Sequence, residues 1–526
     1  MKKLLVLLLA LTLLCGCSKA VDPGSSSSTS GKTSPATSSG VAKEDVIPFD
    51  ETFKFSYLTS VWDPYSADEN LISDMEKATN VKINIEYAPV DNYETRINTV
   101  IASNKIPDAI RLPLLTSVTS LIDQGAVIAI DELLEKYGQN IMSHVNEEDY
   151  PFLRNSSDGL MYMIPYMQDI PVAYSWYIRQ DWMENLGLDT PKTWEDWLKV
   201  WRAFRDNDCN GNGNTKDEIP YTGQIYPFLR CFDIITSSDN YFCVTDDNKY
   251  TLVFEHPNYK SFLTSMANLY AEGILDPEFS TRVDAEMRTV MNADIGGSGY
   301  GWAEQAKLST IALRDGGNAD ATWLCPEPIP GPGGAQSIPS RPKMYQYPTV
   351  ITVGAEKSGN TEKIMQFWNW IYSDEGIRMT NYGVEGTHYN LKDNKPALIE
   401  PYNEGFVNYR GAGMNFQPIS HLWTEEAYMQ VLLTGKTYED LDEPTKIFYD
   451  GLYAGEPYFK ASVPTLVTDA YTKYSTDLLA KALELQANTV AGNISVDTFF
   501  SEYEKLKADG IQEVIDQAAE AWSKVK

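Results

Sequence analysis

The chain has 526 residues, of which 43% are hydrophobic and 22% charged, a composition typical of a globular protein with two or three packed domains. Its 73 acidic side chains outnumber the 43 basic ones and give a formal net charge of −30. Because this charge repels a phosphate backbone, we expect no nucleic-acid partner. The four histidines are widely separated without metal-ligand spacing, which argues against a zinc enzyme.

The N-terminus has the pattern of a bacterial lipoprotein signal. Lys2 and Lys3 precede an apolar run, Leu4 to Leu14, that is too short to be a stable membrane anchor. The run ends in Leu14-Cys15-Gly16-Cys17, which resembles a lipobox, where the cysteine receives a diacylglycerol before cleavage. We therefore expect residues 1–17 to be a signal peptide with its lipobox. The alternative is an ordinary cleaved signal with an incidental cysteine.

An acylated Cys17 would be the protein's only attachment to the membrane. It would hold the protein on the extracellular face of the bacterial cell membrane. Residues 18–44 follow and are rich in Ser, Thr, Gly, Pro and Lys, with almost nothing apolar to pack a core. They predict a flexible tether that spans on the order of 30 Å.

Alternating patterns of strand and helix begin after the tether. Phe53–Leu58 alternates like a strand, Glu69–Thr79 has apolar residues at helical spacing, and Val81–Tyr87 alternates again. This order predicts a βαβ unit in a parallel sheet, with ligand-facing loops at the strand ends. The other predicted elements are a helix at Tyr93–Ser103, a strand at Ile106–Ile110, helices at Trp194–Phe204, Tyr259–Glu272 and Thr361–Ser373, and a mostly helical tail, Leu466–Lys526.

Four cysteines fall in this folded part: Cys209, Cys231, Cys243 and Cys325. They show no CxxC spacing, and the sequence does not say whether they pair. We expect buried free thiols, with at most one disulfide.

Five segments in order carry a resemblance to a known family. They are the strand-helix-strand start followed by Pro107-Asp108, the segment Asp158–Pro165, the segment Tyr177–Trp194, the segment Gly273–Glu278 and the segment Asn381–Tyr389. Together they resemble the extracellular solute-binding proteins of the sugar-binding family 1 type, in the lipoprotein branch common in Gram-positive bacteria. The resemblance covers nearly everything from residue 50 to the end.

The resemblance implies an α/β, two-lobed periplasmic-binding-protein fold of class II type, with a hinge and a helical C-terminal tail. One lobe would hold residues 45–170 and 296–350, and the other residues 171–295 and 351–526. The implied function is that of a monomeric lipoprotein of an ABC importer, without enzymatic activity. It would capture a carbohydrate, an oligosaccharide, in the cleft between the lobes and deliver it to the permease subunits.

A loop between two helical stretches has the pattern of a calcium site. Oxygen-bearing side chains alternate with glycines from Asp208 to Glu218, and Ca²⁺ takes six to eight oxygen ligands. The expected ligands are Asp208, Asn210, Asn212, the Asn214 carbonyl, Asp217 and Glu218. Alginate-binding relatives carry a similar loop, but this one has an extra residue before Asp217. As an EF-hand it would begin at Asp206 and end at Asp217, and a solvated Asn-Gly turn is the alternative.

Flat aromatic faces and planar polar groups are what a sugar site needs. The candidates on loops are Trp62, Tyr65 and Trp176, and Tyr300 and Trp302 in a glycine-rich segment that would let the backbone approach a ligand closely. The polar candidates are Asp63, Asp108, Glu304, Glu385 and His388, each of which could instead be a capping or solvated residue. By contrast, Trp194, Trp197, Trp201, Trp368 and Trp370 lie in periodic helices and are expected in the core.

Two other functions remain open on the sequence. A glycoside hydrolase would need two carboxylates about 5–9.5 Å apart, which 73 acidic residues could supply. However, the chain has no nucleophile elbow, HExxH helix or P-loop. A binding protein for a peptide or another polar solute, or one that serves a sensor, is the second alternative.

Overall fold

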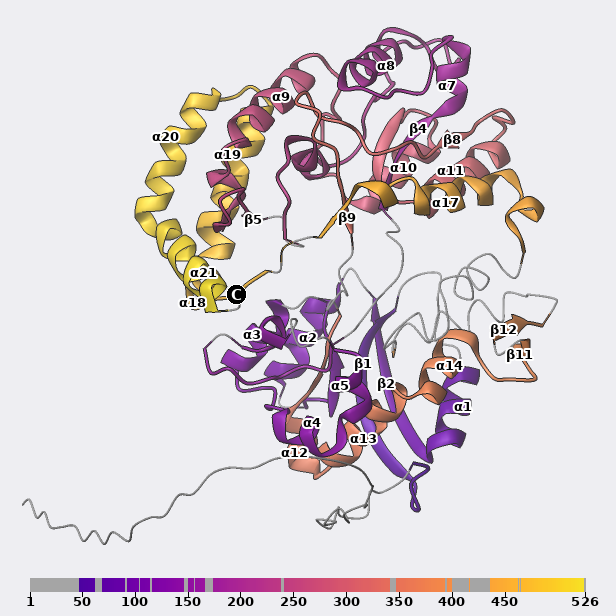
Figure 1. Cartoon of the computed structure of the whole chain (residues 1–526), viewed down its shortest axis with the longest axis vertical. Coiled ribbons are helices and arrows are strands. Elements are labelled where there is room, and N and C mark those ends of the chain that lie inside the picture. Colours follow the sequence, from indigo (N-terminus) through magenta and orange to yellow (C-terminus); the bar gives the residue numbers. More distant parts are fainter. Residues whose placement is uncertain are drawn as a thin grey trace, which may run out of the picture. The chain divides into compact units, whose positions relative to one another are not determined.

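The computed structural model describes residues 47–524 except 62–68, 90–91, 104, 114–115, 146–149, 156, 166–173, 238–240, 341–346, 393–394, 400–415, 417–435, 462 and 464. The predicted signal peptide, Cys17 and the tether lie outside these residues. Two large hydrophobic cores define two α/β lobes (Figure 1). Within the described ranges, no helix combines the length and apolar character needed to cross a bilayer.

Lobe 1 is built on a four-stranded sheet in the order β10-β3-β1-β2. β1 (Phe53–Val61) runs parallel to β2 (Val81–Pro89), with α1 (Glu69–Thr79) between them in the chain. β3 (Ala109–Arg111) is parallel to β1, and β10 (Thr349–Ile351) is antiparallel to β3. The predicted βαβ unit is therefore confirmed.

One face of β1 packs against a helix from far along the chain. Phe55 and Tyr57 project to the same face, because alternate residues of a strand share a face. They contact Phe367 and Trp368 of α13 at ring-centroid distances of 5.4 and 5.6 Å. The other elements of lobe 1 are α2 (Tyr93–Ala102), α3 (Thr116–Asp123), α4 (Asp131–Tyr137), α5 (Gln139–Ser143), α6 (Tyr150–Leu153), α12 (Val353–Ser358), α13 (Thr361–Ile371) and α14 (Asp374–Tyr382), followed by the hairpin β11 (Tyr389–Lys392) and β12 (Lys395–Leu398).

Lobe 2 is centred on β4 (Tyr174–Arg179), which is antiparallel to both of its neighbours, β7 (Ser298–Trp302) and β8 (Trp323–Leu324). Of the tryptophans expected in the core, Trp194, Trp197 and Trp201 lie in this lobe, whereas Trp368 and Trp370 lie in the lobe 1 core. α8 (Trp194–Asp206) begins with a capping box between Thr193 and Asp196, and its Trp197 and Trp201 are fully buried.

Helices and short strands complete lobe 2, and its C-terminal part is helical as expected. They are α7 (Gln180–Asn185), η3 (Tyr226–Phe232), β5 (Phe242–Val244), β6 (Tyr250–Leu252), η4 (Val253–Glu255), α9 (Tyr259–Ala271), α10 (Asp284–Asn292), α11 (Glu304–Asp315), β9 (Ile338–Ser340), η5 (Tyr438–Asp440), α17 (Glu443–Tyr453), η6 (Glu456–Tyr458), β13 (Phe459–Ala461), α18 (Asp469–Tyr474), η7 (Ser475–Leu479), α19 (Ala480–Val490), α20 (Val496–Leu506), η8 (Lys507–Ile511) and α21 (Gln512–Lys524).

The strand pairings place two segments differently from the expected division of the chain. We expected residues 296–350 in lobe 1 and 351–526 in lobe 2. Instead, β7 and β8 pair with β4 in lobe 2, and α13 packs in the lobe 1 core. β10 completes the lobe 1 sheet, where residues up to 350 were expected. Strands as short as these carry too little hydrophobic pattern to indicate their sheet, and backbone pairing decides it.

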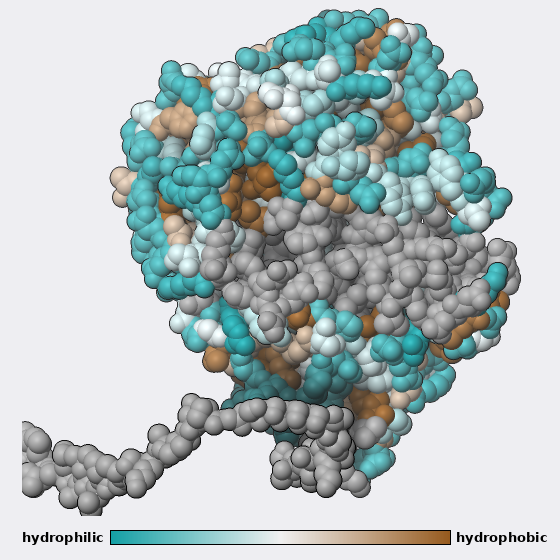
Figure 2. Space-filling model, in the orientation of Figure 1, coloured by the Kyte–Doolittle hydropathy of each residue, from teal (hydrophilic) through white to brown (hydrophobic). Residues whose placement is uncertain are grey.

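The surface of the described residues agrees with the acidic composition of the chain. On the face drawn in Figure 2, hydrophilic residues cover most of the described surface, as suits a chain with a net charge of −30.

Cys209, Cys231, Cys243 and Cys325 are all free thiols. Burial raises the pKa of Cys243 and of Cys325 to about 12, so that both stay protonated at neutral pH.

A buried ion network fixes one end of β4. The Arg179 side chain is fully buried, and its Nε and Nη2 atoms donate to Asp181 at 2.8 and 2.6 Å. Its Nη1 donates to Asp294, and its guanidinium lies 4.6 Å from the ring centroid of Trp182. Because the charge is neutralised by two carboxylates, removing the arginine would leave two acids facing each other in a largely desolvated site.

We predict that Arg179→Met lowers the free energy of unfolding by about 3–5 kcal/mol, because one partner of a buried ion pair is lost. Urea denaturation of the purified protein measures this change. The matched control is Lys260→Ala, which breaks an exposed 2.8 Å pair with Asp497 and should cost less than about 1 kcal/mol. Equal midpoints for Arg179→Met and the wild type would contradict the stabilising role of the network.

Candidate functional site

A row of aromatic side chains crosses the lobe 2 sheet from its core to its surface. The pairing of β4 with β7 sets Tyr174 opposite Trp302 and Trp176 opposite Tyr300, on one face of the sheet. Tyr174 lies 5.9 Å from Tyr300 and 5.8 Å from Trp302 between ring centroids. The exposed fraction rises from 2% at Trp176 through 9% at Tyr300 to 38% at Trp302. We call these four residues the aromatic row.

The 3-10 helix η3 packs beside this row and adds a cation. Phe228 lies 5.1 Å from Trp176 between ring centroids. The Arg230 side chain is buried, and this burial lowers its pKa to about 10, an effect that the neighbouring Tyr300 partly opposes. A guanidinium with this pKa is still protonated at neutral pH. The row therefore carries a positive charge at its buried side.

The glycines of β7 serve the opposite face of the sheet. We expected them to let the backbone approach a ligand closely. A Cβ atom at Gly299 would lie 2.7 Å from the Tyr177 ring, and one at Gly297, the residue before β7, would lie 2.6 Å from the Phe204 ring. The glycines therefore make room for core aromatic rings, which accounts for them without a ligand.

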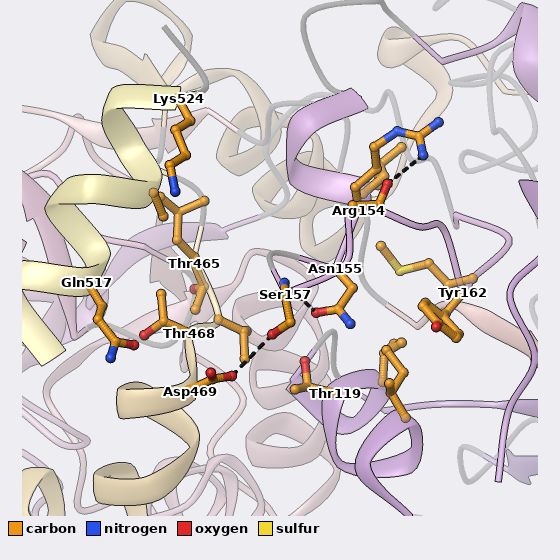
Figure 3. A pocket seen from close by; sticks show the side chains of 18 of the residues that line it. Thr119, Arg154, Asn155, Ser157, Tyr162, Thr465, Thr468, Asp469, Gln517 and Lys524 are labelled. Atoms are coloured by element: carbon orange, nitrogen blue, oxygen red, sulfur yellow. Dashed lines mark hydrogen bonds between the residues drawn. The ribbon is translucent and has the colours of Figure 1, made fainter. Parts of the chain in front are cut away.

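A second feature is a cavity of about 490 Å³ (Figure 3). This volume falls within the range of about 300–1,000 Å³ that is usual for small-molecule sites. Figure 3 shows Thr119, Arg154, Asn155 and Tyr162 of lobe 1 on one side and residues of the C-terminal helices on the other. The cavity is lined by Val118, Thr119, Ile122, Leu153, Arg154, Asn155, Ser157, Gly159, Tyr162, Met163, Thr465, Leu466, Val467, Thr468, Asp469, Gln517, Glu520, Ala521 and Lys524.

Polar side chains meet across this cavity. Ser157 Oγ donates to Asp469 Oδ1 at 3.1 Å, which links a lobe 1 segment to the start of α18 (Figure 3). Arg154 Nη1 donates to Asp131 at 2.6 Å and to the Gly159 carbonyl at 2.8 Å. Hydroxyls, amides and charges of both signs thus share the wall with apolar side chains. This mixture can form hydrogen bonds with an uncharged polyhydroxyl solute.

The carboxyl ends of the lobe 1 strands β1 and β3 are where the sequence predicts ligand-facing residues. Trp62, Asp63 and Tyr65 follow β1 but lie outside the described residues. Arg111, which sequence reasoning missed, is the last residue of β3; it is 4% exposed, and its guanidinium lies 4.8 Å from the Tyr347 ring centroid. Its position at the carboxyl end of a parallel strand is the signal that could have identified it.

Asp108 lies at the other end of β3, away from the ligand-facing ends of the parallel strands. One carboxylate oxygen accepts from the Ser56 amide at 2.8 Å and from Ser56 Oγ at 2.7 Å, and the other accepts from Ser358 Oγ at 2.7 Å. The carboxylate is thus engaged in joining α12 to β1. These hydrogen bonds give Asp108 a structural role in the lobe 1 interior, and a ligand contact by Asp108 stays a prediction.

The other sequence-predicted residues lie at separate positions. Trp176 packs in the lobe 2 core, and Glu304 begins α11, with its carboxylate 3.8 Å from Lys307 Nζ. Glu385 is exposed in the turn before β11. His388 Nδ1 accepts from the Val384 amide at 2.9 Å and so closes that turn. Trp176, Glu304 and His388 thus have local structural contacts, and a ligand contact by any of the four residues stays a prediction.

The 208–218 loop folds around its own oxygen atoms. Asp208 accepts from the amides of Asn212 and Gly213 at 3.0 and 2.8 Å, and the Asn214 amide donates to Asn212 Oδ1 at 2.7 Å. Glu218 is 8% exposed, and burial raises its pKa. One oxygen of Glu218 and one of Asp217 are buried without a hydrogen-bond donor among the described residues.

These buried oxygens fit a hard cation, because it would compensate their lost hydration. No three His, Cys, Asp or Glu side chains of the described chain are arranged to hold a metal by themselves, so amide and carbonyl oxygens would have to contribute. Burial raises the pKa of the Cys209 thiol to about 12, and a hard cation such as Ca²⁺ takes oxygen ligands in preference to sulfur. The loop is therefore an oxygen site or a solvated turn.

Comparison with known proteins shows the family to which this chain belongs. A model of bacterial extracellular solute-binding proteins matches residues 59–377. The chain belongs to this family. Lipoprotein LipO of Bacillus subtilis is 25% identical to this solute-binding protein over 84% of the chain and 86% of its own length.

Two further relatives are named for the carbohydrates they bind. The polygalacturonan/rhamnogalacturonan-binding protein YtcQ of Bacillus subtilis is 24% identical over 99% of this chain and 98% of its own. The fructooligosaccharide ABC transporter substrate-binding protein FusA of Streptococcus pneumoniae is 30% identical over 43% of this chain and 45% of its own.

Solved structures share the fold of this solute-binding protein. The alginate-binding protein AlgQ2, solved without calcium ion, superposes with a TM-score of 0.70 at 22% identity and covers 91% of this chain and 100% of its own. FusA of S. pneumoniae in complex with kestose superposes with a TM-score of 0.66 at 21% identity, covering 90% and 99%. An EF-hand mutant of FusA gives the same TM-score at 20% identity, with the same coverage. The two-lobed α/β fold expected from the sequence is confirmed.

Proposed function

We propose that this protein is the substrate-binding lipoprotein of an ABC importer, which captures an oligosaccharide and delivers it to permease subunits without chemical change. The observation that carries the proposal is the exposure of Trp302. Its side chain is 38% exposed at the end of β7, and its ring is nearly perpendicular to the ring of Tyr174. An exposed indole can lie against the apolar C–H face of a pyranose ring. The carbohydrates in the names of FusA and YtcQ support this ligand class.

We propose that Trp302 and Tyr174 form a contact surface for the sugar, and that the cavity of Figure 3, which is lined in part by hydroxyl groups, is a separate candidate for polar contacts. Tyr300 and Arg230 support the surface from beneath, because both are largely buried. Trp62, Tyr65 and Asp63 stay candidates at the end of β1. A peptide or another polar solute is the second candidate ligand, because the cavity also carries two carboxylates, one ammonium group and one guanidinium.

We predict that Trp302→Ala weakens oligosaccharide binding at least about tenfold, because about 1.4 kcal/mol of stacking is lost. Calorimetric titration of the mature protein in detergent with kestose, nystose, oligogalacturonides and alginate oligosaccharides measures this change. Leu308→Ala, which removes another exposed apolar side chain of lobe 2, is the matched control. Unfolding midpoints should stay near the wild-type value in both variants.

Three results would contradict parts of this proposal. Equal affinities of Trp302→Ala and the wild type would exclude stacking on Trp302. Saturable binding of peptides with no response to any sugar would replace the ligand class. Release of shorter sugars from an oligosaccharide would establish hydrolysis and overturn the non-enzymatic function.

We also propose that the 208–218 loop binds Ca²⁺ as a structural ion. The ligands would be Asp208, Asn210, Asn212, Asp217 and Glu218, with the carbonyl of Asn214. The buried, donor-free oxygens of Asp217 and Glu218 support the site. Two structures of similar fold, AlgQ2 without calcium ion and the EF-hand mutant of FusA, support it as well.

We predict that Ca²⁺ raises the thermal unfolding midpoint, because an ion that binds only the folded state stabilises it by about 2.7 kcal/mol at 100 times its dissociation constant. Differential scanning calorimetry after chelation and after Ca²⁺ addition measures the shift. Glu218→Gln should abolish the shift, whereas Asp247→Asn, in an exposed turn, should keep it. An identical midpoint with and without Ca²⁺ would indicate a solvated turn.

The lipid anchor is a proposal of the same kind, supported by the lipobox and by the similarity to a lipoprotein. We predict that Cys17→Ser abolishes incorporation of labelled fatty acid, because serine lacks the thiol that receives the diacylglycerol. Fractionation of expressing cells should then find the protein outside the membrane fraction. Cys209→Ser, which changes a thiol in the folded part, is the control and should keep the label. Unchanged labelling of Cys17→Ser would contradict the anchor.

A further inference from the structure

The 208–218 loop contains two sequences that are chemically reactive in water. They are Asn210-Gly211 and Asn212-Gly213, and the chain has no other Asn-Gly pair. Asparagine is a labile residue, and a following glycine favours its deamidation because no side chain shields the glycine nitrogen. Both glycines are exposed to solvent, so water reaches the two pairs.

The backbone of the loop accounts for both glycines. Gly211 and Gly213 have positive φ angles of 72° and 87°, which residues with a side chain rarely adopt. A Cβ atom at either position would meet no other atom within 4 Å, so the backbone angle requires glycine and a lack of space does not. The reactive pairs are thus a consequence of the turn, and their surroundings decide which of them reacts.

Deamidation needs only the chain and water. The glycine nitrogen attacks the side-chain Cγ of the preceding asparagine and forms a new N–C bond. The bond from Cγ to the side-chain nitrogen breaks, and that nitrogen leaves as ammonia together with the proton of the glycine amide. Water then opens the cyclic imide at one of its two carbonyls, which gives aspartate or isoaspartate.

The two asparagine side chains are held in similar ways. Oδ1 of Asn210 accepts from the Asn212 amide at 3.0 Å, and Oδ1 of Asn212 accepts from the Asn214 amide at 2.7 Å. Nδ2 of Asn210 donates to the Asp294 carbonyl at 2.9 Å, and Nδ2 of Asn212 donates to Asp217 at 2.7 Å. The side chains therefore do not separate the two pairs.

The glycine nitrogens, in contrast, differ. The Gly213 amide donates to Asp208 Oδ2 at 2.8 Å. The Gly211 amide has no acceptor among the residues that the structure describes. Because a hydrogen bond to a charged group has to break before the Gly213 nitrogen can attack, this bond slows the reaction at Asn212 about tenfold or more.

We propose that Asn210 is a site of spontaneous deamidation and that Asp208 protects Asn212 from the same reaction. The product at position 210 lacks the amide donor, so that a carboxylate faces the Asp294 carbonyl, oxygen against oxygen. Isoaspartate also lengthens the backbone by one carbon. Either product breaks the hydrogen bond that ties the loop to the segment before β7.

Peptide mapping by mass spectrometry tests this proposal. The mature protein in detergent is incubated in neutral buffer with a chelator, and conversion is followed at each asparagine. The same measurement on the chain unfolded in urea gives the intrinsic rate of each pair. Relative to that rate, Asn210 should convert at least about tenfold faster than Asn212 in the folded protein.

A variant tests the protecting bond directly. Asp208→Ala removes the acceptor of the Gly213 amide and should raise the conversion rate of Asn212 about tenfold. The matched control is Asp247→Ala, which removes a carboxylate from an exposed turn outside the loop and should leave both rates unchanged.

Two results would overturn the proposal. One is conversion of Asn212 at a relative rate equal to or above that of Asn210. The other is a folded protein in which neither pair converts while the unfolded chain converts both. The comparison within the wild-type protein decides even if Asp208→Ala does not fold. Neither a sugar nor free Ca²⁺ is present, so the result is independent of the proposed sugar and calcium binding.

Discussion

The packing of both faces of β4 is the constraint on which the rest of lobe 2 depends. On one face, Trp176 and Ile178 enter the large core, and on the other face Tyr177 fits against glycine positions of β7. Arg179 ends the strand in a neutralised ion network. Because neither face can move without opening the core, the strand holds Tyr174 and Trp302 at a fixed place on the surface.

The charges of this protein are divided between surface and interior. The excess of acidic residues is compatible with the hydrophilic surface drawn in Figure 2. Basic groups occur at special places inside, with Arg179 in an ion network, Arg111 against Tyr347 and Arg230 beside the aromatic row. Burying a guanidinium costs free energy, so a buried arginine points to a structural or functional role at its position. An exposed carboxylate carries no such cost and indicates no role by itself.

The 208–218 loop adjoins the same strand system. Asn210 Nδ2 donates to the Asp294 carbonyl at 2.9 Å, and the Asp294 carboxylate pairs with Arg179. After the loop, the Ile219 amide donates to the Ile295 carbonyl at 2.7 Å, three residues before β7 begins. A cation in the loop would therefore support the framework that holds Trp302, while the proposed ligand surface around Trp302 lies at the other end of β7.

The sequence by itself determined the family, the βαβ start and the core helices, because hydrophobic periodicity and motif order are local properties of the chain. Glu69–Thr79 and the tryptophans of α8 follow directly from helical spacing. Only the tertiary structure decided that β7 joins β4 and that β10 joins β3, since pairing depends on residues far apart in the chain. It also decided which aromatic residues are exposed. Trp176 and Trp302 look alike in sequence, but strand pairing buries the first in the core and leaves the second at the sheet's end.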